Sequence, residues 1–359
     1  GVWIMAYTPI DKSSDYFNIV LYTGSGNAQT ISGVGFQPDW LWQKSRSASQ
    51  DPRSFDVVRG GSKLIYPSLT NAEATDAQLI TSFNADGFTM GTSGSNANDN
   101  TVTYVAWNWL AGTSFTNDAS GTGIGSIDSA GSVSTTSGFS IVKWTGTGAT
   151  GTIAHGLGAV PRMIIVKSLA NTTTWMCQHA SIGNAKEIYL NNASAAGSST
   201  AWNSTTPTST VFSVTGGAGD GVNASGDYIA YCFSEIKGYS KISSYLGNGS
   251  ATDNTFVYCG FKPKFILHKA VDAGENWLLW DSPRNTAVNS NGNPTQVIFE
   301  PNGAGAENNT TARAIDLLSN GFKIRGNNAN FGGSGANYVF MAFAENPFVS
   351  STGIPTPAR

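Results

Sequence analysis

The sequence predicts an all-β protein made of three tandem β-sandwich-like repeats, about 100 residues each, with little helix. Apolar stretches are short, rich in Val, Ile, Tyr, Phe and Trp, and bounded by Gly, Asn, Ser and Thr, which is typical of strands joined by turns. Glycine accounts for 42 of the 359 residues, about 12% against a usual 7%. Three signatures also occur in the same order three times, which indicates internal repetition.

Each signature explains one part of the expected repeat. The first is Gly-x-x-Pro followed six residues later by Lys, with apolar residues on both faces of the strand between them; it spans 35–44, 158–167 and 260–269. The second is an aromatic, a tyrosine sixteen residues later and another aromatic five residues on: Phe88/Tyr104/Trp109, Phe212/Tyr228/Phe233 and Phe322/Tyr338/Phe343. The third is an aromatic-headed Gly-x-Gly hairpin at 22–26, 144–148 and 245–249.

These signatures set the expected domain boundaries. Residues 1–13 are an N-terminal extension, and the three β modules occupy 14–112, 138–238 and 239–347. Residues 113–137 are small and polar without apolar periodicity, which predicts a flexible linker or an extended surface loop. Residues 348–359 form a C-terminal tail. A helical turn is an alternative only at 74–83 and 311–318, where we expect strands.

Composition excludes several classes of function. Only 12% of residues are charged, but 40% are hydrophobic and 11% aromatic, so the chain can bury cores and is not disordered. The net charge is −3 without a basic block, which argues against a nucleic-acid partner. Apolar runs such as 338–344 are far shorter than the ~18 residues that span a bilayer, so we expect no membrane insertion.

Polar residues that recur between modules are the first candidates for chemistry. Lys44, Lys167 and Lys269 are expected to cover apolar surface with their methylenes while the ammonium reaches water; a ligand-binding role is the alternative. Eighteen residues after each Pro stand Asp56, His179 and Asp281. Arg59 and Arg284 follow the two aspartates by three positions, which predicts a local Asp–Arg pair at a strand end or turn, with a polar handle for a ligand as the alternative.

Metal and thiol chemistry find little support in the sequence. His155, His179 and His268 are not equivalent in the modules, so we expect no metal site and no cofactor. The Asn-rich stretches 96–100 and 220–223 lack the spaced carboxylates of a calcium loop and are expected to be hairpin tips. Cys177, Cys232 and Cys259 are expected to be buried reduced thiols; a single disulfide or a reactive thiol is the alternative.

Tryptophan is abundant, with ten in the chain. Trp40, Trp42, Trp107 and Trp109 lie in strand patterns and are expected in the core. Three others stand in or beside polar segments: Trp175, Trp202 and Trp277. They are the candidate ligand-binding residues, because exposed rings beside Asn and Thr can stack on saccharides. Contact between subunits and partial burial under loops are the alternatives.

The motifs resemble a family of repeated β-rich modules in virion proteins of tailed bacteriophages, many from marine viruses. The residues that carry this resemblance are 22–26, 35–44, 82–88, 104–107, 344–348 and the final Ala358-Arg359. It covers nearly the whole chain from Tyr7 onward, although the second module departs with Gly158-Ala159-Val160-Pro161. Such proteins are usually called tail-fibre-like or structural, and the resemblance transfers no functional residues.

The resemblance implies a non-enzymatic virion structural protein, assembled in the host cytoplasm and located in a tail or fibre appendage. We expect contacts with other virion proteins, a homo-oligomer with a trimer favoured, and adhesion to a host-surface glycan. One alternative is a capsid-surface decoration or head fibre without receptor binding. The other is an enzyme acting on surface polysaccharide, but it requires paired carboxylates, and equivalent acidic positions do not persist across the modules, so no catalytic residue is predicted.

Overall fold

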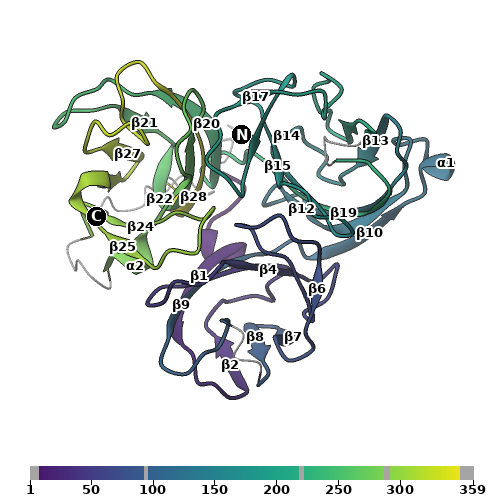
Figure 1. The fold of residues 1–359 in the computed structure, drawn as a ribbon, viewed down its shortest axis with the longest axis horizontal. Helices are drawn as coiled ribbons and strands as arrows, with labels where there is room; N and C mark the ends of the chain where they lie inside the picture. Colours follow the sequence, from purple (N-terminus) through teal and green to yellow (C-terminus); the bar gives the residue numbers. More distant parts are fainter. Residues whose placement is uncertain (1–7, 93–95, 218–221, 287–291, 348–359) are drawn as a thin grey trace, which may run out of the picture.

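Three β-rich lobes surround a common centre (Figure 1). The computed structural model describes residues 8–92, 96–217, 222–286 and 292–347. Lobe 1 holds β1 to β9, lobe 2 holds β10 to β19, and lobe 3 holds β20 to β28. Every paired strand in these lobes is antiparallel, apart from one isolated parallel bridge described below. The predicted all-β class is therefore confirmed.

Each lobe contains one large sheet. In lobe 1 its order is β1 (Phe17–Thr23), β9 (Thr103–Trp109), β3 (Trp40–Ser45), β4 (Arg53–Asp56). In lobe 2 it is β10 (Thr113–Asn117), β11 (Ser129–Ser134), β12 (Phe139–Gly146), β19 (Gly226–Ser234), β14 (Pro161–Ser168), β15 (Met176–His179), β16 (Lys186–Tyr189), β17 (Gly197–Ser198). In lobe 3 it is β20 (Ser240–Leu246), β28 (Asn337–Pro347), β22 (Phe261–Ala270), β23 (Leu278–Asp281), β24 (Val297–Phe299), β25 (Asn308–Asn309). Four strands follow the same order in all three sheets, while descent of the lobes from one repeat stays a prediction.

A smaller sheet covers the outer side of each large sheet. These sheets are β2 (Gln29–Ser32), β8 (Gly87–Met90), β7 (Ile80–Asn84) in lobe 1; β13 (Gly151–Ala154), β18 (Val211–Val214) in lobe 2; and β21 (Phe256–Tyr258), β27 (Gly321–Ile324), β26 (Ile315–Leu318) in lobe 3. β5 (Lys63–Leu64) pairs with β6 (Ala74–Thr75). The helical segments are η1 (Ser13–Asp15), α1 (Ala119–Thr122), α2 (Ser282–Thr286) and η2 (Thr311–Arg313). Strands thus form within 74–83 and 311–318 as predicted, although 311–313 is a 3-10 turn.

The recurrent aromatic residues meet inside each lobe. In lobe 1 the rings of Tyr22 and Tyr104 stack with centroids 5.2 Å apart, and Phe88 meets Tyr22 edge-on at 6.2 Å. The same stacked and edge-on arrangement joins Trp144, Tyr228 and Phe212 in lobe 2, and Tyr245, Tyr338 and Phe322 in lobe 3. Offset and edge-on aromatic pairs add about 0.5–1.5 kcal/mol beyond the area that they bury. The signatures therefore mark the core of each sandwich.

A second core lies at the centre, between the lobes. Trp109, Phe233 and Phe343, one from each lobe, form a triangle with ring centroids 5.8 to 6.5 Å apart. Trp40 stacks on Tyr231 of lobe 2 at 4.3 Å. The central strands of each large sheet are consequently buried on both faces, which explains why both of their faces are apolar.

Backbone hydrogen bonds join the lobes in cyclic order. The Glu73 amide of lobe 1 donates to the Leu169 carbonyl of lobe 2 at 2.9 Å. The corresponding bonds run from Ala196 of lobe 2 to Val271 of lobe 3, and from Glu307 of lobe 3 back to Arg46 of lobe 1, both at 2.9 Å. The single chain therefore closes a ring of three lobes.

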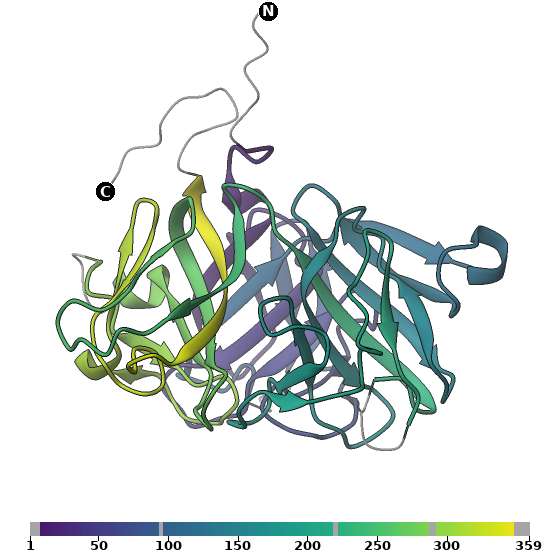
Figure 2. The same cartoon turned by 90° about the horizontal axis from the view of Figure 1, so that it is seen from above.

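The prediction of a linker at 113–137 is wrong. β10 and β11 form a hairpin within this segment, and β11 pairs with β12, so the hairpin extends the large sheet of lobe 2. α1 lies at its outer end (Figures 1 and 2). Pairing with β12 supplies the hydrogen bonds, so strands form here without an apolar pattern of their own. The predicted tail at 348–359 lies outside the described residues, and Ile10 of the predicted extension packs in the central core.

Candidate functional site

The three tryptophans proposed for ligand stacking are buried, at 0 or 1% exposure, so the prediction that they form a stacking platform is wrong. The indole Nε1 of Trp175 donates to the Tyr66 carbonyl of lobe 1 at 2.9 Å, and Nε1 of Trp277 donates to the Tyr189 carbonyl of lobe 2 at 2.7 Å. Trp202 lies in the sandwich core of lobe 2. Because the neighbouring lobe buries Trp175 and Trp277, the polar sequence around them gave no sign of burial.

The recurrent lysines are also buried, which corrects the expectation that their ammonium groups reach water. Nζ of Lys44 donates to the carbonyls of Gln50 and Ala304, the second from lobe 3, at 2.5 and 2.7 Å. Similar carbonyl contacts hold Lys167 and Lys269. Burial lowers the pKa of each of these lysines to about 8. Lys44 and Lys269 each bind a loop of the neighbouring lobe, Lys167 binds a loop of its own lobe, and all three side chains are buried away from any ligand.

The predicted Asp–Arg pairs are confirmed at both positions. Asp56 accepts from Nε of Arg59 at 2.6 Å, and Asp281 accepts from Nε of Arg284 at 2.7 Å. Each carboxylate also receives a hydrogen bond from another lobe, Asp56 from the hydroxyl of Tyr231 and Asp281 from Nε1 of Trp107. Asp56, Asp281 and Arg284 are fully buried, so the pairs stabilise the junctions between lobes, and Arg59 also lines the depression at the junction of lobes 1 and 2 described below.

The histidines and cysteines are isolated groups in the interior. Burial lowers the pKa of His155 and His179 to about 4 and that of His268 to about 3. The cysteines are free and buried, as predicted. Within the described ranges, no group of three His, Cys, Asp or Glu side chains is placed to hold a metal ion.

The Asn-rich stretches hold the adjacent hairpins in place. Asn98 is buried, and its side chain donates to the Asn27 carbonyl at 2.6 Å. Asn223 is likewise buried and donates to the Ala149 carbonyl at 2.6 Å. Residues 220 and 221 of the second stretch lie outside the described residues. Both amides therefore have structural partners on the hairpins of the third signature.

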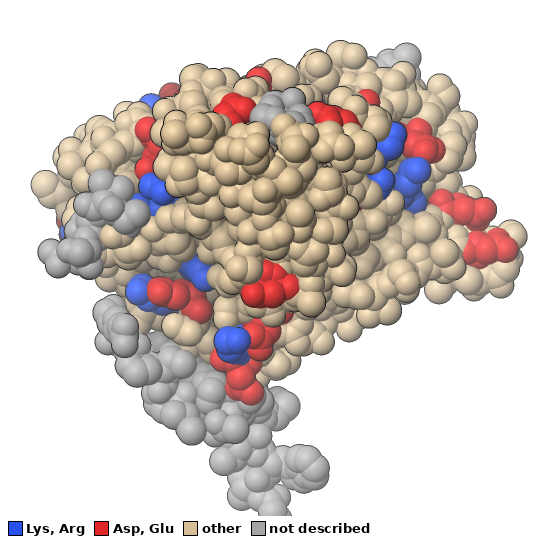
Figure 3. All heavy atoms as spheres, turned by 90° about the horizontal axis from the view of Figure 1, so that it is seen from below, with Lys and Arg blue, Asp and Glu red and all other residues tan. Residues whose placement is uncertain are grey.

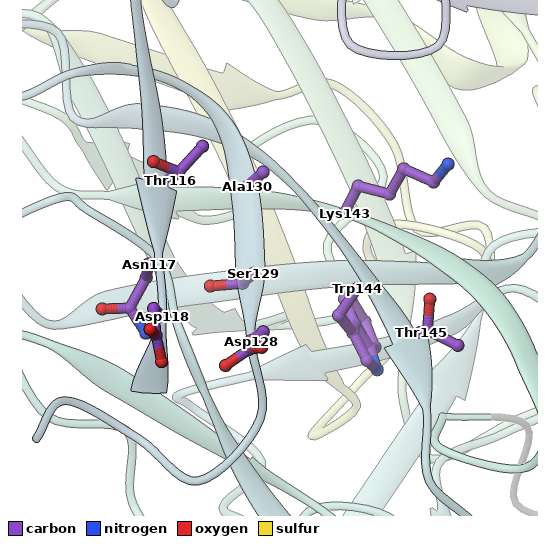
Figure 4. A pocket seen from close by; sticks show the side chains of 9 residues that line it. All are labelled: Thr116, Asn117, Asp118, Asp128, Ser129, Ala130, Lys143, Trp144 and Thr145. Atoms are coloured by element: carbon purple, nitrogen blue, oxygen red, sulfur yellow. The ribbon is translucent and has the colours of Figure 1, made fainter. Parts of the chain in front are cut away.

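An open depression lies on the β10–β11–β12 part of lobe 2 (Figure 4). It has a volume of about 380 Å³. At one end Asp118 accepts from the Gly121 amide and Asp128 accepts from the Ala119 amide, so both carboxylates help to fix the α1 turn. At the other end the Lys143 side chain extends along the sheet.

Lys143 also lines a second depression, of about 510 Å³, at the junction with lobe 1. Its ammonium lies 2.9 Å from the carboxylate of Asp227, which Thr145 also binds, and these contacts lower the pKa of Asp227. Lys63 and Glu73 of lobe 1 face them, 3.5 Å apart. The two depressions share Lys143, and we call them together the polar groove, defined by Thr116, Asp118, Asp128, Lys143, Thr145, Asp227, Lys63 and Glu73.

Two exposed aromatic residues differ from the three tryptophans that the sequence predicted to be exposed. Phe256 and Tyr258 on β21 are 40 and 59% exposed. Their positions follow from register, because Val257 pairs with Phe322 as Ile31 pairs with Phe88 in lobe 1 and Ile153 with Phe212 in lobe 2. At the matching positions the other lobes carry Thr30 and Ser32, and Thr152 and Ala154. Aligning the three modules at this strand would have shown the substitution.

Residues 12–347 match a protein family described as a domain of unknown function, DUF7483. The chain belongs to this family. The match spans all three lobes, from η1 to the last residue of β28, so the DUF7483 domain includes the whole ring. No curated protein and no solved structure matches the chain.

The surface of the DUF7483 domain is sparsely charged. On the face shown in Figure 3, acidic and basic side chains are scattered and frequently adjacent. No helix among the described residues is long and apolar enough to cross a membrane. The exposed polar groove is therefore the candidate binding site of the domain, whereas the recurrent polar residues belong to its framework.

Proposed function

We propose that this chain is a non-enzymatic structural protein of a bacteriophage virion, in a tail or fibre appendage, whose polar groove contacts a host-surface glycan. The burial of its recurrent polar side chains carries the non-enzymatic part. The charged side chains that could act as catalytic acids or bases already make contacts between lobes. Asp56 binds Tyr231, and Lys44 binds the Ala304 carbonyl. The virion assignment is supported by the motifs of the family it resembles.

The ring also suits a component exposed to dilute, salty surroundings. It is held by strand pairing and a shared aromatic core, which salt screens far less than surface ion pairs. The polar groove supplies both donors and acceptors in the open, because Lys143 and Asp227 are 40 and 41% exposed. Sugar hydroxyls donate and accept hydrogen bonds, so this mixture fits a saccharide better than an apolar ligand.

Imaging of particles tests the virion assignment. Fab fragments raised against the purified chain are added to virions of the phage that encodes it, and the complexes are imaged by electron cryo-microscopy. We expect Fab density on the tail or its fibres. Density confined to the capsid would favour the decoration role, and absence of the chain from purified virions would contradict a virion role altogether.

A glycan array tests the groove. We expect the wild-type chain to bind a restricted set of surface glycans and Lys143→Ala with Asp227→Ala to lose at least tenfold in affinity. Lys12→Ala with Asp15→Ala is the matched control, because it removes another exposed ion pair at a distance from the groove. Unchanged binding by the groove variant would place the glycan site elsewhere, and no binding by the wild type would leave a purely structural role.

A further inference from the structure

The small sheets of the three lobes have equivalent edge strands, and the outer edges of these strands have different surroundings. β2, β13 and β21 each border the small sheet of their lobe, and each buries one aliphatic residue against the recurrent phenylalanine of the next strand: Ile31, Ile153 and Val257. In lobe 2 this edge is occupied by another part of the same chain. In lobe 3 it is open among the described residues and bears two exposed aromatic rings.

The occupant of the lobe 2 edge is the end of the loop that follows α1. The amides of Ser126 and Ile127 donate to the Thr152 carbonyl at 3.0 and 3.2 Å, and the Thr152 amide donates to Oγ of Ser126 at 2.9 Å. Ile127 forms a parallel bridge with Ile153 and is 8% exposed in the lobe 2 core. A short extended segment with a buried aliphatic residue thus completes this edge.

The equivalent backbone groups of β21 face away from β27, its one partner strand among the described residues. Toward β27, the Thr255 carbonyl accepts from the Ile324 amide and the Cys259 amide donates to the Asn320 carbonyl. Because alternate residues of a paired strand turn their backbone groups to opposite sides, those of Phe256 and Tyr258 point outward. No segment corresponds to 113–127 here, since only five residues separate β19 from β20.

We propose that the outward edge of β21 binds an extended segment of a partner polypeptide as an added strand, as residues 124–127 complete β13. The backbone of such a segment satisfies the outward amides and carbonyls at strand spacing, which a saccharide cannot do in register. Charged groups beside the edge are already paired, Lys323 with Asp253 and Arg325 with Asp316. Phe256 and Tyr258 offer apolar contact to side chains on the outer face of the segment, while its aliphatic residue lies on the face of Val257.

The occupant of β13 defines the chemistry of the partner segment. It has a glycine where the backbone must approach closely, because a Cβ on Gly125 would lie 2.8 Å from the Thr152 carbonyl oxygen. It places an aliphatic residue two positions later, as Ile127 does. The partner is accordingly an extended Gly-x-aliphatic peptide, and this inference does not depend on the virion assignment or on the glycan.

The probe is a fluorescent peptide with the sequence of residues 122–130, added to the full chain at up to millimolar concentration. We expect saturable binding by fluorescence anisotropy and slower hydrogen–deuterium exchange at 256–258. Phe256→Ala with Tyr258→Ala removes the apolar contact of both rings, and we expect at least tenfold weaker binding. Thr30→Ala with Ser32→Ala on β2 is the matched control and should leave binding unchanged.

Several outcomes would overturn this proposal. They are absence of binding by the wild type, protection confined to β13 or β2, and full binding by the β21 double variant. A glycan-array signal that the β21 double variant abolishes, without peptide binding, would assign the rings to a saccharide. Because both rings are exposed, the double variant should melt at the wild-type temperature, and this measurement separates loss of the site from loss of the fold.

Discussion

The hydroxyl of Tyr231 donates a hydrogen bond of 2.7 Å to the carboxylate of Asp56, although 175 positions separate the two residues. Asp56 also binds the side chain and backbone amide of Arg59, so a residue of lobe 2 completes a buried ion pair of lobe 1. Nε1 of Trp107 binds Asp281 in the same way between lobes 1 and 3. Charges removed from water thus have partners in two lobes, which ties the stability of each lobe to its neighbour.

Tyr231→Phe should lower the free energy of unfolding by about 2 kcal/mol, because a hydrogen bond to a charged group is worth roughly 1.5–3 kcal/mol. The measurement is urea unfolding followed by tryptophan fluorescence, with all lobes unfolding in one transition because they share a core. Tyr258→Phe is the control, since its hydroxyl is exposed and its removal should change stability little. Equal stability of the two variants would contradict this role of Tyr231.

Trp277→Phe should cost about 1 kcal/mol more than Trp202→Phe. Both indoles are buried, so both variants leave a similar cavity. Only Trp277 loses a hydrogen bond across a junction, to the Tyr189 carbonyl, whereas Nε1 of Trp202 has no hydrogen-bond partner among the described residues. Thermal and urea unfolding of the two variants measure the difference, and a larger cost for Trp202→Phe would refute the junction role.

His268→Val should reduce the loss of stability in acid. Burial, followed by the charge of Lys269, lowers the pKa of His268 to about 3, below the 6.5 or so of an unfolded histidine. The unfolded state binds more protons between these values, so stability falls as the pH falls through this window. Valine is the residue of lobe 2 at this position, Val166. Between pH 7 and pH 4 the variant should lose on the order of 3 kcal/mol less than the wild type in urea unfolding.

The buried lysines predict a rise of stability with pH in base as well. Burial lowers the pKa of Lys167 to about 8, against about 10.4 in the unfolded chain. Above pH 8 the unfolded state binds more protons, so stability rises with pH, and below pH 8 this gain is absent. From pH 8 to 9.5 the rise in unfolding free energy should be about 2 kcal/mol smaller in Lys167→Met than in the wild type. Lys12→Met, at an exposed position, should keep the full rise.

The sequence predicted what local patterns determine. Short β-branched and aromatic stretches specified strands, and the recurrent aromatics specified the core of each lobe, since Tyr22, Phe88 and Tyr104 meet within one sandwich. The Asp56–Arg59 pair was also predictable, because three positions separate its members. Each of these contacts depends on spacing within one lobe.

Contacts between lobes could not be predicted in this way. Trp175 and Trp277 lie among polar residues, and their burial comes from chain more than 80 positions away. One signal was present, because both stand fourteen residues after the proline of their module, which marks a shared framework position. The hairpin at 113–137 was not predicted because its strands form by pairing with the neighbouring β12. The polar groove was not predicted because it combines residues of two lobes.

Because the ring closes between the first and the last lobe, folding cannot be completed until the whole chain has been synthesised. Lobe 1 is complete in sequence long before the ribosome reaches Glu307, whose carboxylate binds Arg46 at 2.8 Å and whose amide binds the Arg46 carbonyl. A nascent or truncated product that stops before residue 304 leaves Lys44 without the Ala304 carbonyl and Arg46 without Glu307. The contacts between lobes 3 and 1 therefore form only after the last lobe has been synthesised. An incomplete product exposes its aromatic core residues to chaperones and proteases.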